Sequence, residues 1–245
     1  MFILLIYWLT GYSWNSVSFL PEEFAGFNLF WASSAESGSY INTSMVLLPA
    51  GLKSYNVESK VKEVNISLSY LDLGTIRVTD PYGEILGEER PGVVRTSLGI
   101  HLNFNNKWRG FFSSTVLKVF QKDLNVSEFW ADWVVLSPSF NGNYLVGTVR
   151  MGTFLELGFG AKGGHYSFYL SSKGSGYHTI SASFNYSYRF FKGVGGFYIE
   201  EYSRKKAFKP FLILSFLPSK RLQIDYFYRY ESVLPDIIGF GLRLM

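Results

Sequence analysis

The clearest regularity in the sequence is an alternation of apolar and polar side chains with a period of two residues. Between Val94 and Phe104, mainly apolar residues occupy one set of alternate positions, and Arg95, Ser97 and His101 belong to the other set. Because successive side chains of a β-strand point to opposite faces of its sheet, this period predicts strands with one apolar and one polar face. The same alternation recurs in residues 64–70, 145–151, 178–188, 208–216, 222–230 and 238–244.

The length of these runs separates two kinds of all-β fold. Strands of soluble sandwiches are usually about five or six residues long, whereas a tilted strand needs about 9–11 residues to cross a membrane. Several of the runs reach the longer value. Their polar faces also carry Arg95, Asp225 and Arg229, which a dry sandwich core would exclude and which we predict to face the lumen of a barrel. We therefore predict an antiparallel transmembrane β-barrel with about 10–14 strands.

Turn-forming residues separate the runs. Asp80-Pro81-Tyr82-Gly83 predicts a turn followed by a charged loop over 84–90, and Asn141-Gly142-Asn143 predicts a hairpin turn. No later segment approaches the length of an apolar membrane-spanning helix, so insertion into a membrane would have to rely on strands.

Composition agrees with a barrel whose outer face meets lipid. Aromatic residues make up 19% of the chain and charged residues only 17%, against about 25% charged residues in typical soluble domains. Aromatic residues gather near predicted strand ends, which favours two interfacial girdles over ordinary strand propensity. These residues include Trp108, Phe111, Phe112, Trp130, Trp133, Tyr166, Tyr169, Phe190 and Phe191.

The N-terminus differs from the rest of the chain. Residues 2–9 form an uninterrupted apolar run, too short for a membrane-spanning helix, and small residues follow at Ser16 and Ser18. This pattern predicts a secretory signal over residues 1–18, although no Lys or Arg precedes the apolar run. A buried first strand is the alternative. We expect residues 19–245 to form one barrel domain.

Sequence motifs for chemistry are weak. The chain has no cysteine, and His101, His165 and His178 lack metal-ligand spacing. Residues 158–163 match G-x-G-x-x-G, but a strand-like segment follows instead of the helix that a dinucleotide site needs. An outer-wall Ser–His hydrolase is the enzyme alternative, yet no serine has a recognisable nucleophile context. We predict no catalytic, cofactor or metal residues and no enzymatic activity.

Two short segments bear on partners. The basic run Arg204-Lys205-Lys206 is more typical of a hairpin tip than of a nucleic-acid surface, so we expect no nucleic-acid partner. Near the C-terminus, Gly239, Leu242 and Leu244 match the pattern of a terminal strand that the barrel-insertion machinery recognises, although Met245 stands where an aromatic residue is usual. The terminal strand of a soluble sandwich is the alternative.

Three motifs carry a family resemblance. Residues 48–52, Leu-Pro-Ala-Gly-Leu, are similar to an early Asn-Pro-Ala-Gly-Leu. Residues 66–76, followed by Thr79, Asp80 and Gly83, are similar to a Tyr-Leu-x-x-Gly strand and loop, and residues 222–226 to a penultimate strand. In these motifs the chain resembles the PorV/PorQ-like outer-membrane barrels, which are related in fold to the long-chain fatty-acid transporter FadL. The resemblance implies an N-terminal plug or inner segment, which we place at residues 24–52.

Two functions remain open at this stage. The resemblance implies a barrel of the bacterial outer membrane that passes small or hydrophobic solutes, with the lipid bilayer, the insertion machinery and a small-molecule ligand as partners. The absence of an evident charged ring instead favours a structural, assembly or secretion-accessory barrel of the cell envelope.

Overall fold

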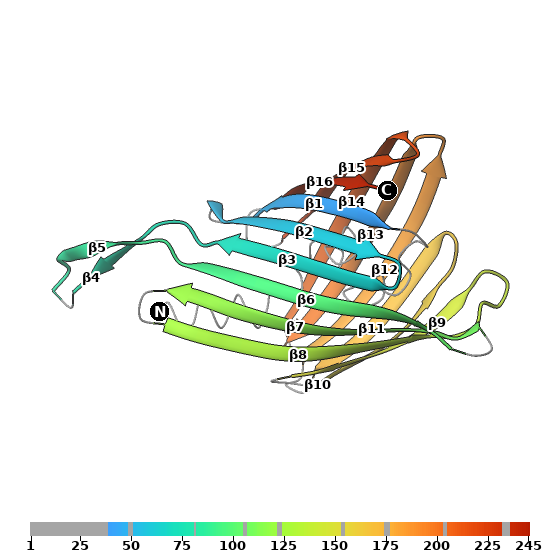
Figure 1. The fold of residues 1–245 in the computed structure, drawn as a ribbon, viewed down its shortest axis with the longest axis horizontal. Helices are drawn as coiled ribbons and strands as arrows, with labels where there is room; N and C mark the ends of the chain where they lie inside the picture. The colour runs from blue at the N-terminus through green and yellow to red at the C-terminus, as the bar shows by residue number, and fades with distance from the viewer. Residues whose placement is uncertain are drawn as a thin grey trace.

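The structure, a computed structural model, describes residues 39–48, 51–80, 82–104, 107–121, 124–152, 155–173, 177–202, 205–231 and 236–245. Its architecture is a closed barrel of fourteen antiparallel strands with a separate two-stranded hairpin (Figure 1). The wall strands are β1 (Tyr40–Leu47), β2 (Lys53–Val61), β3 (Val64–Asp72), β6 (Gly92–Asn103), β7 (Arg109–Gln121), β8 (Leu124–Leu136), β9 (Tyr144–Met151), β10 (Leu155–Lys162), β11 (Tyr166–Lys173), β12 (Tyr177–Tyr188), β13 (Phe191–Tyr202), β14 (Lys205–Ser219), β15 (Leu222–Arg229) and β16 (Ile237–Leu244). The hairpin strands are β4 (Ile76–Thr79) and β5 (Ile85–Glu89). The predicted fold class is confirmed.

The ring closes where β1 pairs with β16, from Ile41 opposite Leu244 to Leu47 opposite Ile238. Every other wall strand pairs with its neighbours along the chain, except that β3 pairs with β6 across the inserted hairpin. Closure removes the unpaired edges that an open sheet would expose to lipid or to other chains. The even strand number is typical of single-chain bacterial barrels.

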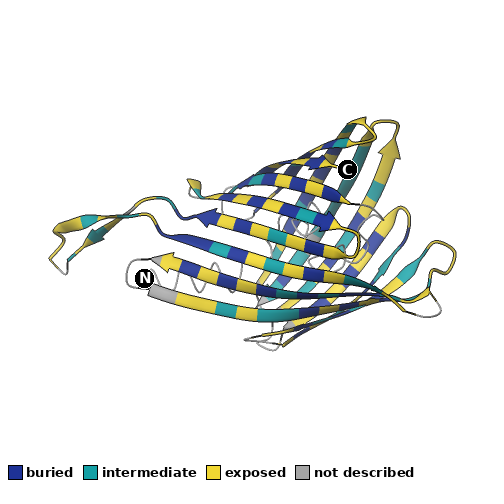
Figure 2. Cartoon of the chain, in the orientation of Figure 1, coloured by how far each residue is buried: buried dark blue, intermediate teal, exposed yellow. Residues whose placement is uncertain are grey.

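Buried and exposed residues alternate along the wall strands (Figure 2). The polar set of the sequence alternation forms the inner face of the barrel, and the apolar set forms the outer face. In β16, Gly239, Gly241 and Arg243 are buried, while Phe240 and Leu242 are 48% and 43% exposed. Every wall strand contributes exposed apolar residues to the outer face. Examples in chain order are Ile41, Val57, Leu68, Leu98, Val116, Val135, Leu145, Leu157, Leu170, Ile180, Phe191, Leu214, Ile224 and Leu242.

The antiparallel order places alternate links at opposite ends of the barrel. One end, here called the short-turn end, has the links at 62–63, 104–108, 137–143, 163–165, 189–190 and 220–221. The other end, here called the arm end, has the links at 48–52, 73–91, 122–123, 152–154, 174–176, 203–204 and 230–236. The hairpin β4–β5 belongs to the link 73–91 and projects away from the barrel at the arm end (Figure 1).

Two sequence predictions need correction. Residues 84–90 are not a loop, because Ile85–Glu89 pairs with β4 around the confirmed turn, in which the Gly83 amide donates to the Asp80 carbonyl at 3.1 Å. The predicted plug at 24–52 also includes β1, which is part of the wall. Asn42 and Ser44 of β1 face inward, so this strand alternates like its neighbours. Residues 24–38 and the predicted signal at 1–18 lie outside the described residues.

Candidate functional site

The inner face of the barrel is the surface where polar chemistry gathers. Twelve buried charged side chains occupy inward-facing positions in the described residues, and their signs balance. The acidic members are Glu58, Asp132, Glu156, Glu200, Asp225 and Glu231, and the basic members are Lys60, Arg95, Arg150, Lys209, Arg229 and Arg243. The three residues predicted from the sequence are among them, with exposed fractions of 9% for Arg95 and 1% each for Asp225 and Arg229. Whether they line a solute path stays a prediction.

The most connected group lies at the arm end and involves β13, β14, the end of β15 and the segment that follows it. The Lys209 ammonium lies 2.8 Å from a Glu200 oxygen and 3.0 Å from a Glu231 oxygen. The Arg229 guanidinium donates to the other Glu231 oxygen at 2.7 Å. We call these four residues the arm-end charge cluster. Because each is at least 90% buried, the charges depend on one another for stabilisation.

A second group surrounds Trp130 on β8. Arg150 donates from Nε to Asp132 at 2.6 Å, and a second guanidinium nitrogen lies 3.3 Å from the other carboxylate oxygen. The guanidinium carbons of Arg95 and Arg150 lie 5.9 and 5.6 Å from the Trp130 ring centroid. An aromatic face attracts cations at this range. Trp130 thus brings Arg95 of β6 and Arg150 of β9 to one inward-facing site.

Hydrogen bonds join inward-facing residues near the short-turn end as well. Glu58 accepts from the Tyr40 hydroxyl at 2.9 Å and from the Asn65 amide at 2.7 Å. On the neighbouring strand β16, the Arg243 guanidinium carbon lies 5.1 Å from the Tyr40 ring centroid. Polar contacts therefore extend through the depth of the barrel, from the arm-end charge cluster to the short turns.

Apolar side chains share the inner face with these polar groups. Near the arm end they lie on two sides of the ring. On the β1–β7 side they include Val46, Leu48, Leu71, Leu73, Val93, Leu117 and Val119, and beside the arm-end charge cluster they include Phe211, Phe227 and Ile237. Apolar side chains thus lie both across the barrel from the arm-end charge cluster and next to it.

Some aromatic residues predicted for the girdles point inward. The exposed members, which agree with a girdle, are Trp108, Trp133, Tyr166, Phe190 and Phe191. The other side chains point inward: Phe111 and Tyr169 are only 5% and 2% exposed, and Trp130 faces the interior. Strand parity decides this, because neighbours one residue apart point to opposite faces.

Three inward-facing phenylalanines pack over glycines of adjacent strands. A Cβ atom at Gly99 would lie 2.6 Å from the Phe111 ring, and one at Gly239 would lie 2.7 Å from the Phe227 ring. At Gly196 it would lie 2.8 Å from the Phe211 ring and 2.3 Å from the Ala182 carbonyl oxygen. Gly239 therefore has a packing role inside the barrel, whereas Leu242 and Leu244 are exposed on the outer face. Their proposed recognition by the insertion machinery stays a prediction.

The enzyme alternative requires a hydrogen-bonded serine and histidine. The structure places a histidine next to a serine and a carboxylate, but without a catalytic contact. Strand register places outward-facing His178 beside Ser172 of β11 and Glu201 of β13. A nucleophile–base pair needs a hydrogen bond, and none joins these three side chains, all of which lie in the described part of the chain. His101 is half-buried and packs on Phe111 with the ring centroids 4.8 Å apart.

Among described residues no group of three or more potential ligands is placed to hold a metal ion. No helix in the described ranges is long and apolar enough to cross a membrane.

The G-x-G-x-x-G match lies in a hairpin. Gly158 and Gly160 belong to β10, and β11 follows where a dinucleotide site requires a helix. A Cβ atom at Gly158 would lie 2.0 Å from the Tyr169 hydroxyl oxygen, so this glycine makes room for the hydrogen bond of 2.6 Å between Tyr169 and Thr148.

Comparisons with known proteins find barrels of similar shape. No family model and no curated protein matches the chain. The KdgM porin in complex with disordered oligogalacturonate is 7% identical, with a TM-score of 0.48 over 84% of this chain and 98% of that chain. CdiB from Acinetobacter baumannii is 9% identical, with a TM-score of 0.44 over 84% of this chain and 59% of that chain. A mutant of the Rh. blastica porin is 8% identical, with a TM-score of 0.40 over 84% of this chain and 98% of that chain. These likenesses are of barrel shape alone.

Proposed function

We propose that this chain is a β-barrel of the bacterial outer membrane that passes small solutes through its interior. The observation that carries the proposal is the closed ring of fourteen strands with an apolar outer face and a polar inner face whose buried charges balance. Soluble monomers rarely expose a continuous apolar surface of this extent. In lipid the same surface needs no cover, and closure satisfies every strand edge.

Charge balance inside the barrel indicates weak selectivity for the sign of a solute. Selective pores place rings of one charge at a constriction. Here each described inward-facing acidic cluster contains or adjoins a basic side chain, as in the pair Asp132–Arg150 and the arm-end charge cluster. Burial of these groups also indicates a narrow path. We therefore expect passage of small polar solutes, with little preference between anions and cations.

The Asp132–Arg150 pair provides a test of solute passage. Replacing both residues by Ala removes two bulky side chains from the inner face together and leaves no unpaired charge. We expect the double variant to show a higher single-channel conductance than the wild-type protein in planar bilayers. Arg77 and Glu88, an exposed pair on the β4–β5 hairpin with nitrogen and oxygen 3.6 Å apart, supply the matched control, and their double Ala variant should conduct like the wild type. A wild-type protein that leaves liposomes impermeable to all small solutes would refute the transport function.

A structural or assembly role is the second candidate, and the β4–β5 hairpin favours it. The tip of this hairpin exposes 91% of Tyr82, 61% of Ile85 and 68% of Leu86, away from the barrel wall (Figure 1). Apolar side chains displayed on a projecting hairpin are suited to contact another protein. A photo-crosslinker at Leu86 should then capture a defined envelope protein in cells, whereas the same group at Lys118 on β7 should not. Equal adducts from both positions would argue against a specific partner.

A further inference from the structure

We propose that the short-turn end binds the phosphate-bearing headgroups of anionic glycerophospholipids through cationic side chains in its turns. The occupant is the lipid leaflet that surrounds this end of the barrel. This inference rests on the membrane location in the proposed function, but it does not depend on solute passage.

The two ends of the barrel differ in the charge of their links. Among described residues, the links of the short-turn end contain five exposed cations and one exposed acid. The cations are Lys62, Lys107, Arg189, Lys220 and Arg221, and the acid is Glu63. The described residues of the arm-end links have the opposite balance at their exposed and half-exposed positions. Their acids are Asp80, Glu84, Glu88, Glu89 and Asp236, and their cations are Arg77 and Arg90.

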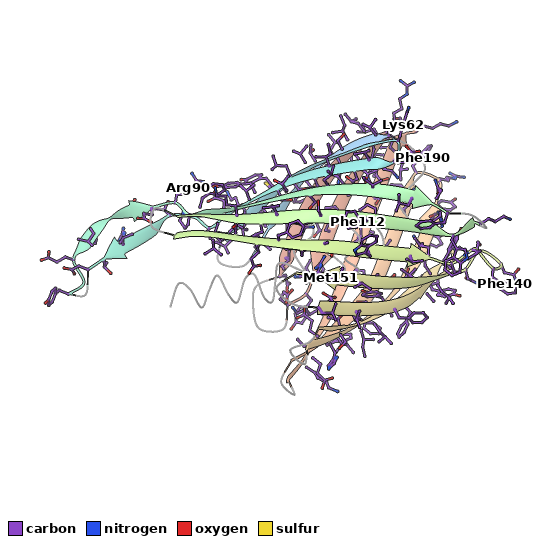
Figure 3. The ribbon with its side chains drawn as sticks, turned by 60° about the horizontal axis from the view of Figure 1, so that its bottom comes forward. Lys62, Arg90, Phe112, Phe140, Met151 and Phe190 are labelled. Carbon is purple, nitrogen blue, oxygen red and sulfur yellow. The ribbon has the colours of Figure 1, made fainter. Side chains whose placement is uncertain are left out.

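The cations form two groups on different sides of the closed ring. One group occupies the links β2–β3 and β6–β7, and the other occupies β12–β13 and β14–β15. The links β8–β9 and β10–β11 contain no Lys or Arg. Figure 3 shows Lys62 and Phe190 at the end of the molecule away from Arg90 and the β4–β5 hairpin. A docked protein would contact one side of the barrel, whereas a lipid leaflet encircles it and reaches both groups of cations. The distribution therefore favours lipid as the partner.

Exposed aromatic side chains accompany the cations. Arg189 is flanked by Tyr188 and Phe190, which are 53% and 59% exposed, and Lys107 is followed by Trp108, which is 42% exposed. The Arg189 guanidinium carbon lies 5.2 Å from the Tyr188 ring centroid. Aromatic rings at barrel ends mark the level of the lipid headgroups. Cations beside these rings are thus at the depth where lipid phosphates lie.

Backbone conformation provides an independent reason to assign a role to the charges. Three of the cations have positive φ angles: 54° at Lys62, 67° at Lys107 and 50° at Arg189. These angles lie in the left-handed region, which Gly and Asn adopt at lower cost. Asn141, in another link of the same end, has a φ of 51° and is a residue suited to this conformation. Strained backbone of this kind often accompanies a functional requirement. Cations at three such turn positions indicate that the charge itself is used.

Substitution by Asn separates the charge from the fold. The triple variant Lys62→Asn, Lys107→Asn and Arg189→Asn suits the left-handed backbone, so we expect its resistance to urea to equal or exceed that of the wild type. The probe is a nanodisc containing equal amounts of phosphatidylglycerol and phosphatidylcholine, followed by native mass spectrometry of the full chain with its retained lipids. The wild type should retain phosphatidylglycerol in preference. In the triple variant the preference for phosphatidylglycerol should be at least about fivefold lower than in the wild type. A change of about fivefold is the effect expected from losing one surface cation at low salt.

The control removes the same charge from the opposite end. The variant Lys53→Gln, Lys118→Gln and Lys206→Gln changes exposed cations of the strands near the arm end and should keep the wild-type lipid ratio. In about 1 M salt, where the Debye length is about 3 Å, the wild-type preference should disappear.

Two results would overturn the proposal. They are a wild-type lipid ratio in the Asn variant and an equal loss in both triple variants. A chain that does not enter nanodiscs refutes the membrane location instead, so the two failures are distinguishable.

Discussion

Replacing Lys209 by Met is expected to lower the free energy of unfolding by about 3–5 kcal/mol, because it leaves two buried carboxylates without their shared cation. In the native barrel the Lys209 ammonium lies within 3.0 Å of both Glu200 and Glu231, and all three side chains are at least nine-tenths buried. Methionine fills a similar volume, so the loss reflects charge rather than packing. Urea unfolding of the folded barrel in detergent micelles, followed by heat-modifiable migration on gels, measures the change.

A matched control lies on the same pair of strands. Lys206 and Glu201 also pair between β13 and β14, at 3.5 Å, but their side chains are 67% and 40% exposed. Lys206→Met should therefore cost no more than about 1 kcal/mol, as is usual for surface ion pairs. Adding Glu200→Gln to Lys209→Met should recover part of the lost stability by removing one of the unpaired charges. Equal destabilisation by Lys209→Met and Lys206→Met would contradict the inward, buried placement of the arm-end charge cluster.

The second large effect is expected from Gly196→Val in β13, with a loss of about 1–3 kcal/mol or more. A Cβ atom at this position would lie 2.3 Å from the Ala182 carbonyl oxygen and 2.8 Å from the Phe211 ring. The first contact is with backbone of the adjacent strand, which cannot move without disturbing the β12–β13 ladder. The same urea and gel measurements report the loss of folded barrel.

Its neighbour Gly195 is the control. Gly195 lies at the opposite parity of the same strand, and a Cβ atom there would have nothing within 4 Å. Gly195→Val should therefore leave the unfolding midpoint unchanged or raise it slightly through added apolar contact with lipid or detergent. If Gly195→Val were the more damaging of the two variants, the assignment of inner and outer faces in β13 would be wrong.

The alternation of apolar and polar residues predicted the class of fold, because the sequence of each strand alone shows which of its faces is apolar and which is polar. The alternation in residues 222–230 and 238–244 specified one apolar and one polar side before any partner was known, and run length favoured a membrane barrel over a sandwich. The inward positions of Arg95, Asp225 and Arg229 follow from the same parity. Strand parity also explains which part of the aromatic prediction was wrong, since Phe111 and Tyr169 lie on the inner face.

The contacts of the candidate site depend on register between strands, which a single run does not specify. Lys209 is one of several lysines in its region. Parity within β14 separates it from Lys206, but only the pairing of β13 with β14 places it beside Glu200. Likewise, the alternation within Tyr40–Leu47 is local, but its place in the wall requires pairing with β16 from the other end of the sequence. The sequence by itself thus determined that this chain forms two-faced strands of membrane-crossing length. Tertiary structure decided the closed ring of fourteen, the pairing of buried charges and the cationic short-turn end, because these depend on contacts between residues far apart in the chain.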